Sequence, residues 1–403
     1  MVILPARSCR GVACRRTANG IAWIERERVM KTKAAVLYER GQPRPYTTSR
    51  PLAVDELELD PPGDGEVLVK VRAAGICHSD LSVINADRPR PTPMAIGHEA
   101  AGEVVEVGAG VTKVRNGDHV VMVFVPSCGH CLPCVEGRPA LCEPGAAANN
   151  EGTLITGSRR LHKGGQHIHH HVGVSAFAEY AVCSENSLIK IDRDLPFEEA
   201  ALFGCAVLTG VGLAANTAKV APGSTVAVVG VGGVGLNAML GAELCGARKV
   251  VAIDLQDDKL QLAKQLGADD VFNAGDPDCI AKVREATSGG VDYALELAGS
   301  VKALRLAYDI TRRGGTTATA GLANLNDELS IPAVGLVGEE RTIKGSYLGS
   351  CVPLRDVPRY IELYRKGKLP VDRLMSQTIG FDEINLAFDR LADGRTVRQI
   401  LVP

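Results

Sequence analysis

The first part of the chain alternates hydrophobic and polar residues in short segments. Val, Ile and Leu alternate with polar side chains over residues 34–38, 66–74, 102–107 and 119–123, and Pro-Gly or Gly-Asp pairs separate the segments. A period of two over such lengths, with turn residues between, is typical of β-strands. We therefore predict a compact, mostly antiparallel β domain in this part of the chain.

The hydrophobic spacing changes after residue 205. An apolar run at 225–229 is followed by a glycine-rich turn at 230–235, a helix of small residues to about 245, and a second apolar run that ends at Asp254. Strand and helix segments then alternate to residue 320. Alternating βα units predict an α/β fold with a doubly wound parallel sheet. Mixed helix and strand follow from about residue 347, and we expect this tail to rejoin the first domain.

Length and composition fit two domains. A chain of 403 residues is too long for one compact core, and 45% hydrophobic with 23% charged residues are ordinary for a globular protein. We assign residues 31–206 and 347–403 to the β-rich domain and residues 207–346 to the parallel-sheet domain. Residues 144–172, rich in Gly, Asn and His, are expected to form a long loop.

Charge and hydropathy argue against two classes of partner. The formal net charge is −2, which does not suit nucleic acid or an anionic membrane surface. No apolar run reaches the ~18 residues of a membrane-spanning helix. We expect neither a nucleic-acid nor a membrane partner.

Residues 1–30 differ in character from the rest of the chain, and we expect them to be a disordered extension. Arginines alternate with small residues there, and the first 24 residues contain no acidic side chain, which keeps a transit peptide as an alternative. The Ser content and amphipathic pattern of a transit peptide are weak. We favour an upstream extension, with Met30 as the real start.

Four of the twelve cysteines are crowded into one segment, Cys128-x2-Cys131-x2-Cys134-x7-Cys142. Four thiolates complete the coordination of a tetrahedral zinc and leave no position for a substrate. Disulfides or unrelated buried thiols are the alternatives, but such short spacing favours metal. We predict a structural zinc site and, because its thiols must stay reduced, a cytoplasmic protein.

A second set of possible zinc ligands comes from three separate motifs. Cys77 lies in Gly-Ile-Cys-His-Ser-Asp, His98 in Gly-His-Glu, and Cys205 follows a glycine. Two thiolates and one imidazole would leave one position of a tetrahedral zinc open for water or substrate. A lone cysteine is more often a buried apolar residue. Two neighbours favour the metal: Ser79 offers a hydroxyl, and Glu99 a carboxylate that could support or transiently bind the ion.

The glycine-rich turn has the form of a dinucleotide-binding motif. It follows an apolar strand and opens a helix, whose N-terminal N–H groups favour phosphate. Gly232 lets the pyrophosphate approach, and Gly235 packs the helix against the strand. Asp254 can accept both ribose hydroxyls and would repel a 2′-phosphate, so we predict NAD over NADP. The residues expected to contact the cofactor here are Gly230, Gly232, Gly233, Val234, Gly235 and Asp254.

These motifs occur together in the order of one family. From about Lys31 to Val402 the chain resembles the zinc-dependent alcohol dehydrogenases of the medium-chain dehydrogenase/reductase family, with the long segment of the liver type after the four cysteines. The resemblance implies a GroES-like β-rich catalytic domain beside a Rossmann domain. It implies two zinc ions per chain, one of them catalytic on Cys77, His98 and Cys205, the set for which alcohol dehydrogenase is the known example.

The activity implied is the reversible, NAD-linked oxidation of primary alcohols, aromatic or medium-chain, to aldehydes, in class EC 1.1.1.1. Zinc would lower the O–H pKa of the alcohol, and hydride would pass to the nicotinamide. Ser79 is implied as the first proton carrier. Ser82 stands where the liver type has the histidine that ends the relay, so water or His78 must complete it. The implied assembly is a homodimer, with a tetramer as the alternative.

The resemblance also assigns contacts to single residues. His78 and Arg398 match positions that contact the cofactor pyrophosphate, and Lys259 matches one that contacts the adenosine ribose. Three residues match apolar substrate-wall positions, and His171 falls where the liver type has an aromatic wall. A polar loop over 167–171 is the alternative for His171, which as a wall residue could donate a hydrogen bond to substrate. The three wall residues are Phe124, Leu322 and Tyr347.

Two other functions stay open. A dehydrogenase of S-hydroxymethyl thiol conjugates, from the same family, would need basic residues at the pocket mouth. Arg88 is a candidate, but Ala146 stands where glutathione-dependent relatives carry arginine. A non-catalytic zinc and dinucleotide sensor is the alternative of another class, although a sensor needs no open coordination position. The sequence identifies neither the alcohol nor the preferred direction.

Overall fold

The computed structural model describes residues 14–17, 20–23 and 29–403. Within the predicted extension, strands β1 (Cys14–Thr17) and β2 (Gly20–Trp23) pair antiparallel, where we expected disorder. The other residues of the extension before residue 29 lie outside the described residues, and disorder there stays a prediction.

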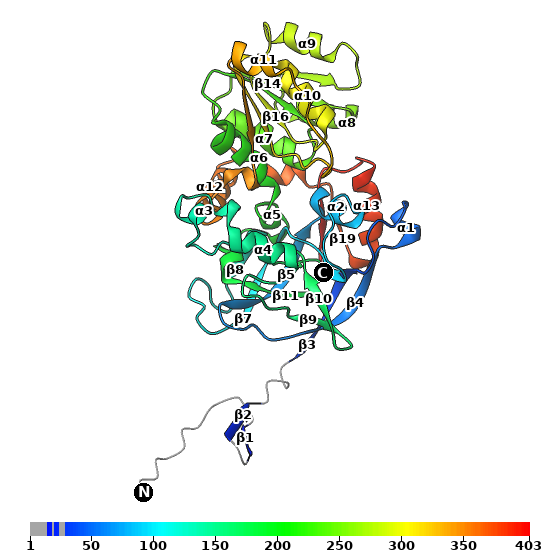
Figure 1. Cartoon of the computed structure of the whole chain (residues 1–403), viewed down its shortest axis with the longest axis vertical. Coiled ribbons are helices and arrows are strands. Elements are labelled where there is room, and N and C mark those ends of the chain that lie inside the picture. Colours follow the sequence, from blue (N-terminus) through cyan, green and yellow to red (C-terminus); the bar gives the residue numbers. More distant parts are fainter. Residues whose placement is uncertain (1–13, 18–19, 24–28) are drawn as a thin grey trace.

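The β-rich domain forms the lower lobe in Figure 1 and includes both ends of the described main body. Its strands are β3 (Met30–Leu37), β4 (Leu52–Leu59), β5 (Glu66–Gly75), β6 (Met94–Ala95), β7 (Ala100–Val107), β8 (His119–Met122), β9 (Leu161–Lys163), β10 (Gln166–His170), β11 (Tyr180–Ser184), β12 (Leu188–Ile191), β19 (Gln377–Ile379) and β20 (Gln399–Leu401). A closed barrel has the order β10-β6-β3-β4-β9. A second sheet has the order β12-β8-β7-β5-β20-β19, with β11 also paired to β5. Because β20 pairs antiparallel with β5, the C-terminal tail returns to this domain.

The helices of this domain pack around the second sheet and fill a common core. They are α1 (Tyr46–Ser49), α2 (His78–Ile84), α3 (Leu132–Val135), α4 (Glu143–Glu151), α5 (Phe197–Leu202), α12 (Pro353–Arg365) and α13 (Ile384–Ala392), with short helices η2 (Pro139–Leu141), η3 (Glu185–Ser187), η5 (Leu348–Ser350), η6 (Val371–Leu374) and η7 (Phe381–Glu383). Phe177, Phe203 and Phe388 are completely buried in the largest apolar cluster. Residues from both chain segments therefore build one core.

Residues 144–172 are not the long loop that we predicted. They contain most of α4, together with β9 and β10. Helix α4 ends at Gly152 in the left-handed conformation, which favours glycine at a helix end. Gly164 and Gly165, both at positive φ, make the two-residue connection between β9 and β10. The segment thereby closes the barrel instead of crossing its surface.

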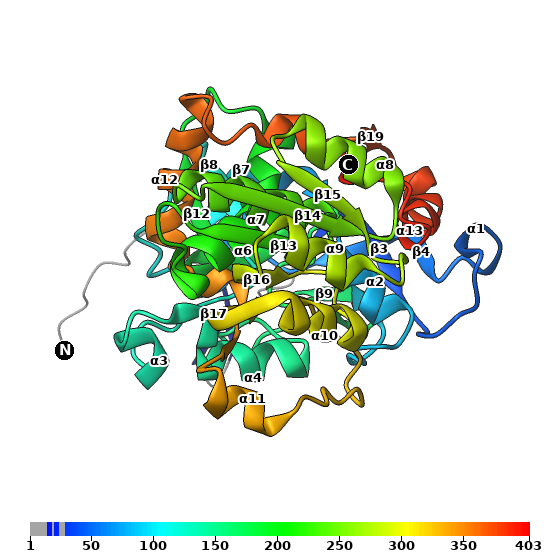
Figure 2. The ribbon, with the colours of Figure 1, turned by 90° about the horizontal axis from the view of Figure 1, so that it is seen from above.

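The parallel-sheet domain is the upper lobe in Figure 1. Its strands are β13 (Thr225–Val229), β14 (Lys249–Asp254), β15 (Asp270–Asn273), β16 (Val291–Glu296), β17 (Thr311–Thr319) and β18 (Thr342–Gly345), and its helices are α7 (Gly233–Leu244), α8 (Asp257–Gln265), α9 (Cys279–Ala286), α10 (Val301–Ile310) and α11 (Ala333–Gly338). All neighbouring strands are parallel, in the order β15-β14-β13-β16-β17-β18. Figure 2 shows β15, β14, β13, β16 and β17 side by side in that order. This is the predicted doubly wound Rossmann arrangement.

Strand β13 shows why the sheet has helices on both faces. All five of its residues are buried. Val226 and Val228 belong to an apolar cluster with α7, while Ala227 and Val229 belong to a second cluster with α9 and α10. A strand that is apolar at every position is typical of a parallel sheet covered on both sides.

Helix α6 (Ala206–Gly212) and the π-helix η4 (Leu213–Ala218) connect the two domains. Val207 and Leu208 are buried in the core of the β-rich domain, whereas Leu213 is buried with the parallel sheet. The boundary between the apolar cores of the two domains therefore lies between Leu208 and Leu213. No helix among the described residues is long and apolar enough to cross a membrane.

Candidate active site

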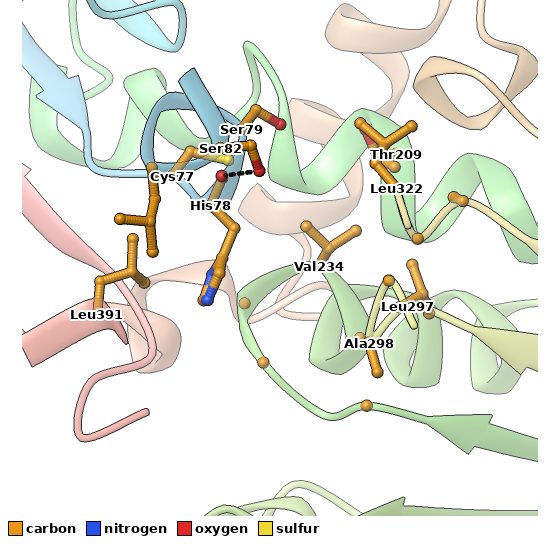
Figure 3. A pocket seen from close by; sticks show the side chains of 18 of the residues that line it. Cys77, His78, Ser79, Ser82, Thr209, Val234, Leu297, Ala298, Leu322 and Leu391 are labelled. Atoms are coloured by element: carbon orange, nitrogen blue, oxygen red, sulfur yellow. Dashed lines mark hydrogen bonds between the residues drawn. The ribbon is translucent and has the colours of Figure 1, made fainter. Parts of the chain in front are cut away.

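A cleft of about 470 Å³ lies between the two domains and collects most of the predicted site residues. It is lined by the start of α2, the turn between β13 and α7, and the end of β14. Figure 3 shows His78, Ser79 and Val234 around this space. The predicted residues in its wall are Cys77, His78, Ser79, Phe124, Cys205, Gly230, Gly232, Gly233, Val234, Gly235, Asp254, Lys259, Leu322 and Tyr347.

The possible catalytic ligands are brought together at one buried point. One donor atom from each of Cys77, His98, Glu99 and Cys205 lies within 4.8 Å of the others. Cys77 is the residue before the first turn of α2, and Cys205 is the residue before α6. All four side chains are buried. Segments from three parts of the sequence therefore supply two thiols, one imidazole and one carboxylate to a common centre.

Asp80 sets the orientation of His98. Its Oδ1 lies 2.8 Å from His98 Nδ1, and His98 Nε2 lies 3.4 Å from Cys205 Sγ. A carboxylate on one imidazole nitrogen fixes the tautomer and directs the other nitrogen toward a metal. Burial disfavours the charged ring of His98, but Asp80 and Cys77 raise its pKa well above the usual value. Sequence reasoning did not select Asp80, although it directly follows Ser79.

Charges around the cysteine pair favour a thiolate. A hydrogen bond from the Cys205 thiol, the positive charge of Arg398 and that of His98 hold the pKa of Cys77 well below its ordinary value, although burial opposes them. Burial raises the pKa of Glu99 to about 7. Its carboxylate lies 3.3 Å from the Arg398 guanidinium, yet neither oxygen has an aligned hydrogen-bond partner in the part of the chain that the structure describes. Glu99 is therefore a buried carboxylate whose oxygens are free to take another partner.

Gly75 explains how Glu99 fits beside these ligands. A Cβ atom on Gly75 would lie 2.6 Å from Glu99 Oε1, so any larger residue would displace the carboxylate. The backbone N–H of Gly75 also donates to the carbonyl of Glu99 at 2.8 Å. Strand β5 thus holds Glu99 and leads directly into Cys77.

The four crowded cysteines form a separate cluster in a lobe of the β-rich domain. Their sulfur atoms lie within 4.8 Å of one another, and all four are free thiols. Cys142 Sγ accepts hydrogen bonds from the N–H groups of Cys128 and Gly145, at 3.2 and 3.4 Å. Cys128 Sγ accepts one from Cys131 N–H at 3.3 Å. Backbone donors aimed at sulfur favour the thiolate form that zinc requires.

The turn between β13 and α7 is built for close approach. A Cβ atom on Gly235 would lie 1.9 Å from the Gly230 carbonyl oxygen, whereas one on Gly232 would have no neighbour within 4 Å. Gly235 is therefore required by the fold, and Gly232 leaves open space beside the helix N-terminus. At the end of β14, Asp254 accepts the backbone N–H groups of Val231 and Gln256 at 2.8 and 3.0 Å.

Arg398 lies between the metal-ligand cluster and the glycine-rich turn. Its side chain is buried, and one terminal nitrogen donates to the Ile76 carbonyl at 3.0 Å. A Cβ atom on Gly233 would lie 2.7 Å from Arg398 Nε, so the guanidinium packs against the first turn of α7. Nε and Nη2 have no hydrogen-bond partner among the described residues. Nη2 lies 3.3 Å from the Glu99 carboxylate without an aligned hydrogen bond, so both donors at this helix N-terminus could turn to an anionic phosphate.

His78 and Lys259 line the same cleft. His78 is an exposed residue of the cleft wall. Partial loss of water around its ring lowers its pKa, and the charges of Lys259 and Arg398 lower it further, against the effect of Cys77. This direction favours the neutral ring, which can still donate a hydrogen bond. The Ser82 hydroxyl donates to the backbone carbonyl of His78 at 2.9 Å, as Figure 3 shows. The Ser82 hydroxyl therefore uses its hydrogen within helix α2, but its oxygen can still accept a hydrogen bond.

A smaller cavity of about 50 Å³ adjoins the cleft. Both cavities have four wall residues in common: Ser79, Phe124, Leu322 and Tyr347. The Phe124 ring meets the rings of His98 and Tyr347 edge-on, at centroid distances of 5.3 and 5.8 Å. His171 also lines this cavity, as do Arg88 and Arg90.

His171 directly follows strand β10 and is buried, so it does not lie in an exposed polar loop. Its Nδ1 lies 3.3 Å from Asp80 Oδ1, so Asp80 contacts both His171 and His98. Burial lowers the pKa of His171, which favours a neutral ring. Arg90 was not selected from the sequence either, and the available signal was the Arg-Pro-Arg-Pro segment at 88–91, which places two positive charges close together.

Known proteins resemble both halves of this arrangement. The model of the alcohol dehydrogenase GroES-like domain matches residues 63–193, and that of the zinc-binding dehydrogenase domain matches residues 233–366. Putative alcohol dehydrogenase D of Mycobacterium tuberculosis is 41% identical over 93% of this chain and 100% of its own length. The S-(hydroxymethyl)glutathione dehydrogenase of Synechocystis is 38% identical over 92% of this chain and 100% of its own length.

A solved structure agrees with these matches. The benzyl alcohol dehydrogenase of Acinetobacter calcoaceticus is 35% identical, with a TM-score of 0.86 over 93% of this chain and 99% of that one. A GroES-like domain joined to the Rossmann-type domain of the zinc-binding dehydrogenases defines an oxidoreductase that uses zinc and a nicotinamide dinucleotide. The chain belongs to the zinc-dependent alcohol dehydrogenases of the medium-chain dehydrogenase/reductase family.

Proposed function

We propose that the chain is an NAD-dependent alcohol dehydrogenase of class EC 1.1.1.1 that interconverts primary alcohols and aldehydes. The observation that carries this proposal is a shared cleft: two members of a buried Cys, His and Cys set open into the same space as the glycine-rich turn. A hydride can pass only between groups held in contact. The cleft brings the two required sites to one place.

We propose two zinc ions per chain. The donor set of Cys77, His98 and Cys205 suits a catalytic zinc, since a fourth position is left to substrate or to the Glu99 carboxylate, which lies beside Arg398 without an aligned hydrogen bond. When bound there, zinc supplies a Lewis acid that lowers the O–H pKa of an alcohol. The four-cysteine cluster suits a structural zinc, because four thiolates leave no open position.

We propose that Ser79 is the first carrier of the proton. It lines both cavities and lies next to the buried cluster in sequence, so its hydroxyl can accept a proton from the alcohol as it passes one onward. Ser82 cannot act as a terminal base at neutral pH, and its own hydrogen is donated to the His78 carbonyl. We propose that the neutral His78 ring or water in the cleft completes the relay.

The dinucleotide would lie along the turn between β13 and α7. Gly233 and Val234 line the cleft at the start of α7, where their N–H groups would bind its pyrophosphate, and Arg398, which packs against Gly233, would add a positive charge. Asp254 at the end of β14 would accept ribose hydroxyls and repel a 2′-phosphate, which favours NAD over NADP. Lys259 lines the same end of the cleft and would contact the adenosine ribose.

The benzyl alcohol dehydrogenase at 35% identity supports an aromatic primary alcohol as substrate. Phe124, Leu322 and Tyr347 give the pocket the apolar wall that such a ring requires. A second candidate is an S-hydroxymethyl thiol conjugate, which the 38% identical relative supports. Arg88 and Arg90 in the smaller cavity favour this candidate, because such conjugates carry carboxylates.

We also propose a cytoplasmic homodimer. Strand β18 is one of the two edge strands of the parallel sheet. Nearby, α11 exposes 78% of Val334 and 82% of Val337, which is unusual for apolar side chains unless a partner covers them. Light scattering during size-exclusion chromatography tests this proposal, and a monomer at micromolar concentration would contradict it.

Steady-state kinetics test the activity. Zinc-loaded protein is assayed with NAD or NADP against benzyl alcohol, hexanol and formaldehyde, with and without glutathione. We expect reduction of NAD by benzyl alcohol without added thiol. Activity with formaldehyde only when thiol is present would favour the second candidate, and inactivity with every substrate would indicate a protein that only binds its cofactors.

A further inference from the structure

Two arginines line the small cavity above the possible metal ligands. Arg88 and Arg90 follow helix α2 and share the cavity wall with Ser79, His98 and Tyr347. Both side chains are only partly exposed. An ordinary pocket for a neutral aromatic alcohol is lined mainly by apolar groups. Two guanidinium groups in so small a space therefore require an explanation.

Neither arginine has an acidic partner among the residues that the structure describes. One terminal nitrogen of Arg90 donates to the Asn149 carbonyl at 3.0 Å and to Asn150 Oδ1 at 2.5 Å, and both acceptors are neutral. The guanidinium of Arg88 has no hydrogen bond to a described residue; only its backbone N–H donates, to Ser82. The pair is positioned without having its charge neutralised.

The nearby carboxylates are already occupied. Asp87 bonds with the side-chain amides of Asn85 and Asn324. Asp80 contacts both His98 and His171. Burial lowers the pKa of Arg90, and the charge of Arg88 lowers it further, which agrees with two positive groups facing one space. Charges removed from water are normally paired, so an anion brought by a ligand would complete the site.

We propose that this cavity binds the carboxylate of the substrate, with Arg88 and Arg90 as the specificity-determining residues. The proposal rests on the proposed alcohol dehydrogenase activity and deepens it by naming an anionic substrate class. A planar carboxylate matches the fork of an arginine with two parallel hydrogen bonds. Arg90 is held by the two asparagines, whereas the Arg88 guanidinium, without a hydrogen bond to a described residue, can donate to the bound group.

The carboxylate can come from two sources. One is an aromatic or aliphatic alcohol that carries an acid group at the end opposite the hydroxyl. The other is an S-hydroxymethyl conjugate of a thiol that itself carries carboxylates. Both place the hydroxyl carbon near Ser79 and an anion near the arginines, since the cavity reaches from Ser79 and His98 to Arg88 and Arg90. The test includes one representative of each source.

A matched pair of substrates measures the preference. The zinc-loaded enzyme is assayed with NAD and either benzyl alcohol or 4-(hydroxymethyl)benzoate, which differ by one carboxylate, and separately with formaldehyde plus glutathione. We expect a higher kcat/KM for a carboxylate substrate than for benzyl alcohol. Of the two sources, the one with the higher kcat/KM is the one that the enzyme uses.

Substitution of Arg88 tests its role directly. Arg88→Gln should reduce the ratio of kcat/KM for the preferred carboxylate substrate to that for benzyl alcohol by about 10- to 100-fold, mainly through KM, as for a lost charge-assisted hydrogen bond. Arg88→Lys keeps the charge and should retain part of the preference. Arg115→Gln is the matched control, because the Arg115 side chain is 84% exposed and outside both cavities. An unchanged ratio in Arg88→Gln and in the double variant with Arg90→Gln would overturn the proposal.

Binding without turnover separates this proposal from the activity on which it rests. Benzoate and its neutral counterpart benzamide are titrated calorimetrically into the enzyme with NADH. We expect benzoate to bind more tightly, to weaken as salt is added, and to lose this advantage in Arg88→Gln. Equal binding of the two probes would contradict the anion site even in an active alcohol dehydrogenase. Absence of any alcohol oxidation, with benzoate binding intact, would contradict only the proposed activity.

Discussion

The two clusters of metal-ligating side chains differ in how the chain builds them. Cys128, Cys131, Cys134 and Cys142 come from one short segment, and three of them are only partly buried. Cys77, His98, Glu99 and Cys205 come from three distant parts of the sequence and are all buried. The first cluster is held by its own loop. The second is built by three segments of the β-rich domain, and its two cysteines line the cleft between the two domains.

Their surroundings differ in the same way. Backbone N–H groups of neighbouring residues surround the sulfur atoms of the four-cysteine cluster. Around the other cluster, charged side chains take this role: Asp80 orients His98, and Arg398 lies beside Glu99. Charged groups and an open position suit a site where charge changes during a reaction, whereas a closed set of thiolates suits a site that only stabilises the fold.

The largest expected effect is loss of activity when the buried cluster is broken. Cys77→Ser should lower kcat/KM for benzyl alcohol by at least about 10³-fold, equivalent to roughly 4 kcal/mol of transition-state stabilisation. Metal analysis should show one zinc fewer per chain, with the circular dichroism spectrum unchanged. Undiminished turnover by this variant would contradict the role of Cys77.

Breaking the four-cysteine cluster should reduce stability more than activity. Cys134→Ser should also remove one zinc per chain, but its main effect should be on stability. A loss of about 3 kcal/mol would lower the melting temperature by roughly 6–12 °C, at about 2–4 °C per kcal/mol. Calorimetry and kinetics on the same preparation check both parts. Loss of activity without loss of stability would mean that the comparison between the clusters is wrong.

The stability of the β-rich domain should depend on pH through a histidine of strand β10. His170 in β10 is buried, accepts the Arg160 N–H at 3.1 Å, and has its pKa lowered to about 4 by that burial. The neutral ring is favoured in the folded state, so its stabilisation is complete above the unfolded pKa of about 6.5 and is lost as pH falls toward 4. By pH 5 this loss should be about 2 kcal/mol.

Urea unfolding between pH 7 and pH 5 measures this effect. His170→Gln should lose less stability than the wild type over that range, because Gln does not titrate. His167→Gln is the matched control, since His167 lies in the same strand but is exposed. An identical pH dependence in the wild type and His170→Gln would contradict the assignment.

The last prediction distinguishes a glycine needed for dinucleotide binding from a glycine needed for folding. Gly232→Ala should leave stability unchanged, because a Cβ there has no neighbour within 4 Å, but should weaken NADH binding by about 10- to 100-fold through a clash with the cofactor. Gly235→Ala places its Cβ 1.9 Å from the Gly230 carbonyl oxygen and should destabilise the protein even without cofactor. Fluorescence titration with NADH and thermal unfolding compare the two variants. Equal NADH affinity in Gly232→Ala and the wild type would contradict the predicted cofactor position.

The sequence predicted the parts whose signals are local. The apolar run of β13, the glycine-rich turn and the alternating βα units identify the parallel sheet, because a strand covered on both faces must be apolar throughout. The spacing of the four cysteines likewise identifies a cluster, since short spacing forces the sulfur atoms together.

The parts that depend on distant contacts could not be predicted. Helix α4 has no apolar stripe, and one of its anchors is Asn149, whose amide donates to the Phe124 carbonyl at 3.0 Å. The histidines of β10 look like a polar loop, but pairing of β10 with β6 turns His170 inward. The double contact of Asp80 and the unpaired guanidinium of Arg88 likewise arise from packing and not from spacing.

The most direct test of the central claim is anomalous diffraction at the zinc edge from crystals of the active, zinc-loaded protein with NADH. The account predicts two peaks per chain. One should lie within bonding distance of the Cys77 and Cys205 sulfurs, at about 2.3 Å, and of His98 Nε2, at about 2.0–2.1 Å, facing the nicotinamide. Crystals of protein that oxidises alcohols but has no peak between Cys77, His98 and Cys205 would contradict it.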